Sequence, residues 1–181
     1  MKLIVIRGPA GSGKSSVARE LHNTATEKTA LLPLDLFRVD IAKEQEGAPL
    51  ITADIIGHAA KRFLDADYTV ILEGIFNLKK DYYKDLFADL LQYNQAYSHI
   101  YFLEVSLEES INRNSARPKG NAIDEGAIRE WYPKSQKSGY KIEKVINTEE
   151  QPIEDVVKQI ADECDLKLDE NNYKKNFMSS I

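Results

Sequence analysis

The clearest chemical pattern in the sequence is the run Gly8-Pro9-Ala10-Gly11-Ser12-Gly13-Lys14-Ser15-Ser16. Its first eight residues fit the spacing G-x-x-x-x-G-K-[ST], in which glycines let backbone N–H groups curl around phosphate oxygens. Lys14 is placed to reach the β- and γ-phosphates, and the Ser15 hydroxyl is placed to bind Mg²⁺. We therefore predict that this run binds a nucleoside triphosphate together with Mg²⁺.

A second pattern, Asp35-Leu36-Phe37-Arg38, follows an apolar segment that is expected to form a strand. A carboxylate at that position faces the γ-phosphate and can accept a proton from an attacking hydroxyl group. If Asp35 begins a helix, Arg38 lies one turn later and can hold an anionic or hydroxyl-bearing acceptor. The alternative interpretation is that Asp35 caps a helix and Arg38 is its solvated partner.

Glu73 stands at the end of a third apolar segment, Tyr68–Leu72. It is a candidate to hold Mg²⁺ through water, or to orient Asp35 or the substrate. The alternative is an acidic side chain that is simply exposed at a strand end.

Two arginines four residues apart, Arg113 and Arg117, form a third candidate group. On a helix they would share one face, where two like charges are unfavourable unless an anion lies between them. Guanidinium groups neutralise the charge that develops during phosphoryl transfer. Between Arg113 and Lys144 the chain has eight Lys or Arg against four Asp or Glu, so we expect a lid over about 113–139. Trp131 and Tyr132 follow as candidates to line an acceptor pocket or to stack on a base, with ordinary packing as the alternative.

The remaining composition excludes several classes of protein. No lysine stands in the N-K-x-D pattern of a GTPase, and the third apolar segment does not end in the Asp-Glu pair usual in motor ATPases. The net charge of −5 disfavours a surface that coats nucleic acid, and the lone cysteine, Cys164, excludes a disulfide framework. The apolar run before Arg7 is too short for a signal peptide or membrane span, so we expect a soluble, cytoplasmic protein.

Strand-like and helix-like segments alternate along the 181 residues, which predicts one α/β domain with helices on both faces of a parallel sheet. Ligands in such sheets bind where the strands end. The polar tail from about Asp165 is expected to fray. The expected strands are Lys2–Arg7, Thr29–Leu34, Tyr68–Leu72, His99–Val105 and Lys144–Asn147. The expected helices are Lys14–Thr24, Leu50–Asp65, Lys79–Tyr93, Leu107–Ala116, Asp124–Trp131 and Ile153–Cys164. Asp35–Pro49 is expected to be part helix and part loop.

Three stretches resemble the small P-loop kinases, a group that includes adenylate-kinase-like, zeta-toxin-like and chloramphenicol-phosphotransferase-like enzymes. They are Gly8–Ser16, Asp35–Arg38, and Arg113–Arg117 with Ile123–Tyr132, and they look most like the kinase domain of phage-type polynucleotide kinase. The resemblance implies a three-layer α/β/α fold with strand order 2-3-1-4-5. It also implies that Asp35 is the general base, that Arg38 holds the acceptor, and that Arg113 and Arg117 bind the nucleotide phosphates.

The leading hypothesis is an ATP- and Mg²⁺-dependent kinase that phosphorylates a hydroxyl group of a small molecule. A polynucleotide 5′-hydroxyl kinase is the alternative that the resemblance favours and the net charge opposes. A non-catalytic nucleotide-binding regulator is a third possibility. The sequence leaves the acceptor, the choice between ATP and GTP, and the oligomeric state open.

Overall fold

In the computed structural model, which describes residues 1–44, 51–93, 97–118 and 122–169, five parallel strands form one sheet. The strand order is β2-β3-β1-β4-β5, as the resemblance implied. The strands are β1 (Leu3–Arg7), β2 (Thr29–Pro33), β3 (Thr69–Gly74), β4 (Ser98–Glu104) and β5 (Glu143–Asn147). All five coincide with the predicted segments to within one or two residues at each end.

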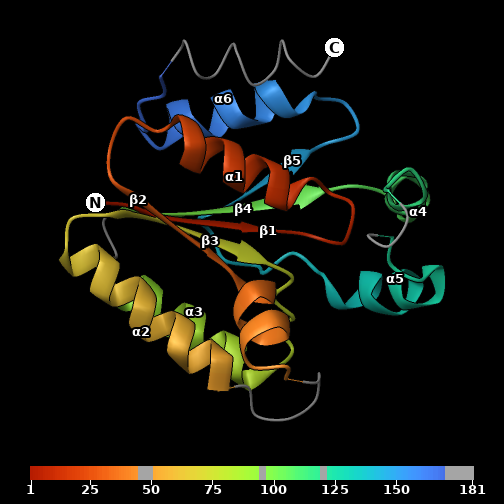
Figure 1. The fold of residues 1–181 in the computed structure, drawn as a ribbon, viewed down its shortest axis with the longest axis horizontal. Helices are drawn as coiled ribbons and strands as arrows, with labels where there is room; N and C mark the ends of the chain where they lie inside the picture. Colours follow the sequence, from red (N-terminus) through yellow and green to blue (C-terminus); the bar gives the residue numbers. More distant parts are fainter. Residues whose placement is uncertain (45–50, 94–96, 119–121, 170–181) are drawn as a thin grey trace.

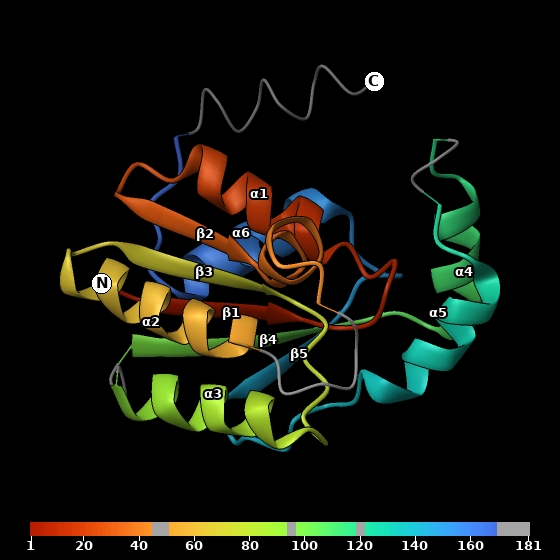
Figure 2. The same ribbon diagram turned by 60° about the horizontal axis from the view of Figure 1, so that its bottom comes forward.

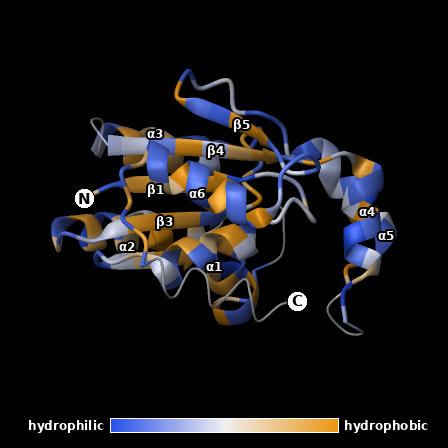
Figure 3. Cartoon of the chain, turned by 90° about the horizontal axis from the view of Figure 1, so that it is seen from above, coloured by the Kyte–Doolittle hydropathy of each residue, from blue (hydrophilic) through white to orange (hydrophobic). Residues whose placement is uncertain are grey.

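Helices cover both faces of this sheet (Figure 1). One face carries α1 (Lys14–Thr24) and α6 (Ile153–Glu163), and the other carries α2 (Ile51–Asp65) and α3 (Asp81–Tyr93). Successive side chains of a strand point to opposite faces, so β1 contributes to both cores. Leu3 and Val5 pack with α2 and α3, whereas Ile4 and Ile6 pack with α1 and α6. The central strands β1 and β3 are correspondingly apolar along most of their length, whereas the edge strand β5 is largely hydrophilic (Figure 3). The three-layer α/β/α arrangement is thus confirmed.

Two further helices, α4 (Leu107–Ser115) and α5 (Glu125–Trp131), project beyond the carboxyl ends of the strands (Figure 2). The 3₁₀-helix η3 (Tyr132–Lys134) follows α5. Within the described residues, the segment over about 113–139 that we expected to form a lid contains the end of α4, the turn after it, α5, η3 and the stretch that follows η3. The Asn114 side chain bonds both the N–H and the C=O of Ile123, at 2.9 and 2.8 Å, which joins the end of α4 to the start of α5.

The chain after α6 differs from the prediction as far as it is described. We expected fraying from about Asp165, but residues 165–169 run back along the N-terminal part of the chain. The Lys2 ammonium donates to the Asp165 carbonyl at 2.7 Å, and Leu168 forms an antiparallel bridge with Ala25. Backbone pairing holds this stretch in place, and the polar sequence gives no sign of that pairing. The remainder of the tail lies outside the described residues. No helix in the described part is long and apolar enough to cross a membrane.

Candidate active site at the phosphate-binding loop

The phosphate-binding loop connects β1 to α1, where its glycines adopt backbone conformations that other residues avoid. Gly13 has a φ of 85°, in the left-handed region that favours glycine. Gly8 has a φ of 150°, and a Cβ atom there would lie 2.3 Å from the Leu103 carbonyl oxygen. The loop can therefore pass directly over the end of β4 and present its N–H groups at the start of α1, whose positive end favours an anion.

The register of the sheet brings the predicted carboxylates to this loop. Ile6 and Pro33 both pair with Glu73, so β1, β2 and β3 end at the same edge. Asp35 lies two residues beyond the end of β2 and precedes η1, a π-helix over Leu36–Ile41. π-helices are rare and often occur at functional sites. The edge therefore holds Lys14, Asp35 and Glu73 close enough for their charges to interact.

Ser15 and Glu73 form the pair expected of a magnesium site. The Ser15 hydroxyl donates to a Glu73 carboxylate oxygen at 3.1 Å, and Glu73 is only 7% exposed. Hydroxyl and carboxylate oxygens are the hard ligands that Mg²⁺ prefers. Within the described residues no three His, Cys, Asp or Glu side chains cluster as a separate metal site. Ser15 and Glu73 fit a Mg²⁺ ion that takes its other ligands from phosphate and water.

The Lys14 ammonium is buried against the phosphate-binding loop. It donates to the Pro9 carbonyl at 2.6 Å. Burial lowers the pKa of Lys14, and the negative charges of Glu73 and Asp35 oppose that shift. Burial likewise raises the pKa of Glu73, opposed first by the charge of Lys14. A triphosphate entering the loop supplies negative charge beside Lys14 and so favours the charged form of this lysine.

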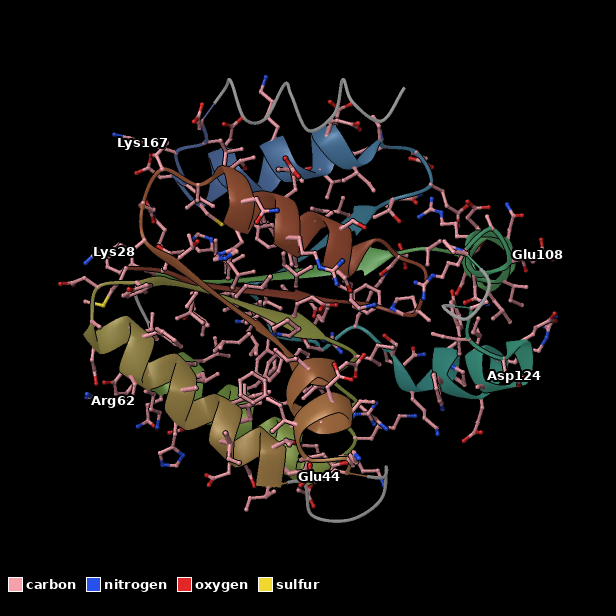
Figure 4. The ribbon with its side chains drawn as sticks, in the orientation of Figure 1. Lys28, Glu44, Arg62, Glu108, Asp124 and Lys167 are labelled. Atoms are coloured by element: carbon pink, nitrogen blue, oxygen red, sulfur yellow. The ribbon has the colours of Figure 1, made fainter. Side chains whose placement is uncertain are left out.

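Asp35, at the N-cap of η1, and Arg38, within η1, lie together as their spacing predicts. An Arg38 guanidinium nitrogen lies 3.2 Å from an Asp35 carboxylate oxygen. Asp35 occupies the N-cap position of η1 but its side chain makes no capping hydrogen bond within the described residues. Its carboxylate is 64% exposed and paired with Arg38, as the alternative interpretation also expected. Glu44, beyond the end of η1 (Figure 4), accepts hydrogen bonds from Ile51 and Thr52 at the start of α2.

The two arginines of the predicted lid take different positions. Their spacing would place them on one helix face, but the helix was expected to end at Ala116; α4 ends at Ser115, and Arg117 lies in the turn before Pro118. The residue before a proline disfavours the helical conformation, which ends the helix early. Arg113 donates to Glu109 at 2.7 Å, to the Thr148 carbonyl at 2.8 Å and to the Gly11 carbonyl at 3.3 Å. Arg117 is exposed, and its charge acts on Lys14.

A pocket of about 340 Å³ opens on the α1 and α6 side of the loop. Gly11, Ser12 and Gly13 line one wall, Arg113, Arg117, Thr148 and Gln151 line another, and apolar side chains of α1 and α6 such as Val17 and Val156 also border it. Sequence reasoning placed Thr148 at the ligand-binding edge but assigned no role to it or to Gln151. The only available signal was that both follow the last strand.

Comparison with known proteins agrees with this geometry. The model of the AAA_33 family, described as an AAA domain, matches residues 3–132. A search of curated proteins found no match. Among solved structures, a sugar kinase from a Janibacter species is 19% identical, with a TM-score of 0.68 over 92% of this chain and 95% of that one. A gluconokinase from Sinorhizobium meliloti is 19% identical, with a TM-score of 0.65 over 99% of this chain and 98% of that one.

A third similar structure is the Pnkp1/Rnl/Hen1 RNA repair complex, at 21% identity and a TM-score of 0.57. The match covers 75% of this chain but only 44% of the other. These likenesses confirm that the fold is one that small P-loop kinases share. Since the family model spans well over half of the sequence, the chain belongs to the AAA_33 family of P-loop AAA domains.

Proposed function

We propose that the protein is an ATP- and Mg²⁺-dependent kinase that transfers the γ-phosphoryl group to a hydroxyl group of a small-molecule acceptor. The observation that carries the proposal is the convergence of Lys14, the Ser15–Glu73 pair and Asp35 at one sheet edge. A kinase needs these three kinds of group: a cation for the phosphates, oxygen ligands for the metal, and a base for the acceptor.

Each side chain takes one part of the transfer. The acceptor hydroxyl oxygen attacks the γ-phosphorus while Asp35 accepts its proton, and the bond from that phosphorus to the bridging oxygen breaks to release ADP. Lys14 neutralises charge on the β- and γ-phosphates, and Arg117 approaches the same charge from the turn after α4. Ser15 and Glu73 would hold the Mg²⁺ ion, which when bound would neutralise phosphate charge. Arg38 orients the acceptor and Asp35.

Support for a kinase also comes from the similar structures. Two of them are a sugar kinase and a gluconokinase, which act on small molecules that carry hydroxyl groups. The nucleoside part of ATP fits the pocket between the loop and Thr148, on the side of the sheet away from Asp35. The sequence and the site do not distinguish adenine from guanine, so the choice of ATP follows the kinase proposal.

Replacing Asp35 with Asn tests the proposal most directly. Asn keeps the shape but cannot accept the proton, so kcat falls by about 10²–10⁴-fold while the Kd for ATP stays unchanged. Transfer is measured as ADP released in the presence of an acceptor panel, and nucleotide binding by calorimetry. An unchanged kcat would remove Asp35 from the reaction. ATP binding without transfer to any acceptor by the wild type would instead favour the nucleotide-binding regulator.

A polynucleotide 5′-hydroxyl kinase is the second candidate. The Asp35–Arg38 contact and the likeness to the RNA repair complex favour it. A filter-binding assay with a labelled oligonucleotide separates the two candidates. Binding that weakens steeply with salt is expected only when phosphate contacts hold the acceptor.

A further inference from the structure

A second cavity, of about 380 Å³, lies against the phosphate-binding loop on the opposite face of the sheet from the nucleotide pocket. Phe102 and Glu104 of β4 line it, and they point to the same face as Ile100, which packs with α2 and α3. Ser135, Gln136 and Lys137 line its other side, from the segment that follows η3. The cavity is within the size range of small-molecule sites.

This cavity lies beside the part of the phosphate-binding loop that contacts Lys14, on the β4 side of β1. Pro9 lines it, and the Pro9 carbonyl is the group that accepts the Lys14 ammonium hydrogen bond at 2.6 Å. Phe102 pairs with Arg7 in the sheet register, so the residues after Phe102 run alongside the start of the loop. A molecule in the cavity therefore lies next to the phosphate-binding loop without entering the nucleotide pocket.

One basic and one acidic side chain line the cavity together with two hydroxyl groups. The two opposite charges neutralise each other. Lys137 and Glu104 form an ion pair at 2.8 Å, and the Tyr132 hydroxyl donates to the Val105 carbonyl at 2.8 Å. The Ser135 hydroxyl is buried and has no hydrogen-bond partner in the described part of the chain. Hydroxyl groups both donate and accept, so a ligand with several of them matches such a lining. A phosphate chain would meet no uncompensated positive charge here.

The walls of the cavity are held by Arg7, which is 1% exposed. Its guanidinium donates to the Gln136 carbonyl at 2.6 Å and lies 5.2 Å from the centre of the Phe102 ring. It also pairs with Glu143 at 2.7 Å, and Glu143 accepts from the Ser138 N–H at 2.6 Å. The segment that lines the cavity is thus fixed before a ligand arrives, which reduces the cost of ordering it on binding.

We propose that this cavity binds the non-reacting part of the acceptor, and that the acceptor is an uncharged polyhydroxylated small molecule. The proposal rests on the proposed kinase function and specifies its acceptor. It assigns to Gln136 and Lys137 a part in acceptor binding that neither their sequence nor the comparisons suggest.

The first test measures kinetics with a panel of neutral polyols of three to six carbons. Gln136→Ala and Lys137→Met are expected to raise the KM for the polyol by about 10-fold, the effect of one lost hydrogen bond, and to leave the KM for ATP unchanged. Lys141→Met is the matched control, because Lys141 is an exposed lysine of the same segment outside the cavity. An unchanged polyol KM in both cavity variants would overturn the site while the kinase function stands.

The second test needs no activity. Sorbitol added to ¹⁵N-labelled wild-type protein is expected to shift the amide signals of Ala10, Ser135, Gln136 and Lys137. Shifts confined to η1 and α2, or no shifts at millimolar sorbitol, would overturn the site. Shifts at the cavity in a protein that phosphorylates no polyol would support the site and count against the proposed function.

The class of acceptor is tested by competition between matched molecules. Gluconate differs from sorbitol chiefly in its carboxylate, so a lower KM for gluconate would overturn the assignment of an uncharged acceptor. Phosphorylation of a 5′-hydroxyl oligonucleotide with a salt-dependent KM, unaffected by Lys137→Met, would overturn it in favour of a nucleic acid.

Discussion

Arg7 and Lys14 are buried cations at the two ends of the same loop, and they differ in how completely they are paired. Arg7 contacts Glu143, two backbone carbonyls and the face of Phe102. Lys14 contacts one carbonyl, and the carboxylates of Glu73 and Asp35 act on it only as nearby charges within the described residues. Burial lowers the pKa of both side chains.

The difference shows how a fold separates structural charge from functional charge. A buried charge is stable when its partners are complete, and is costly when one is missing. Arg7 has most of its partners inside the protein, since only its Nε atom has no hydrogen-bond partner within the described residues, and it joins β1 to the segment that follows η3. Lys14 is incompletely paired, so its ammonium group is still able to bind an anion, which would supply the missing partner. Arg113 and Arg117 show the same contrast nearer the surface. Replacing each of the four cations should show which of them mainly affect the stability of the fold and which mainly affect the activity.

The largest effect is expected for Lys14→Met, which keeps the aliphatic stem and removes the charge. Transfer to any acceptor should fall below detection, because the other cation that faces this space, Arg117, is exposed and approaches only from the turn after α4. The free energy of unfolding should change less than in Arg7→Met, since Lys14 has few partners to lose. ADP release and urea denaturation measure the two quantities. Wild-type transfer in this variant would remove Lys14 from the phosphate site.

Arg7→Met should instead act on the fold. Removing one partner of a buried ion pair typically costs ~3–5 kcal/mol, because the other charge is left unpaired. Urea denaturation measures the loss, and Arg7→Met/Glu143→Gln should recover part of it by removing the orphaned carboxylate. A loss below ~1 kcal/mol, or no recovery in the double variant, would contradict the structural role of Arg7.

The same contrast explains what the sequence could predict. The apolar run Leu3–Ile6 and the glycine spacing after it are local signals, so the strands, their helices and the phosphate-binding loop could all be placed in advance. Arg7 and Glu143 are 136 residues apart, and the sequence contains no periodic signal that links them. The cavity beside Pro9 also forms from segments that are distant in the sequence, and its lining residues follow no regular spacing that would reveal it. The end of the helix before Pro118 is also a local signal, because the residue before a proline disfavours the helical conformation, and α4 ends at Ser115, one residue before the expected Ala116.

Arg113→Ala should cost stability first. Its guanidinium joins α4 to the phosphate-binding loop and to the segment after β5, through Glu109, Gly11 and Thr148. Loss of hydrogen bonds from a charged group is expected to cost ~1–3 kcal/mol. The KM for ATP should rise as well, because Gly11 and Thr148 both line the nucleotide pocket. Denaturation midpoints and ATP titrations measure both effects. An unchanged midpoint would show that this arginine is not structural.

The smallest effect is expected for Arg117→Ala, and it should fall on the chemistry alone. The Arg117 side chain is exposed and its charge lowers the pKa of Lys14, so the two cations face the same space beside the loop. Two like charges tolerate such proximity at low cost only when an anion joins them. A lowering of kcat by about 10-fold with an unchanged Tm is therefore expected, since one exposed guanidinium stabilises developing charge less than a buried donor does. If the Tm fell as far as in Arg113→Ala, Arg117 would be a structural cation like Arg7 and Arg113. Lys14 would then be the only one of these four cations that acts on the phosphates.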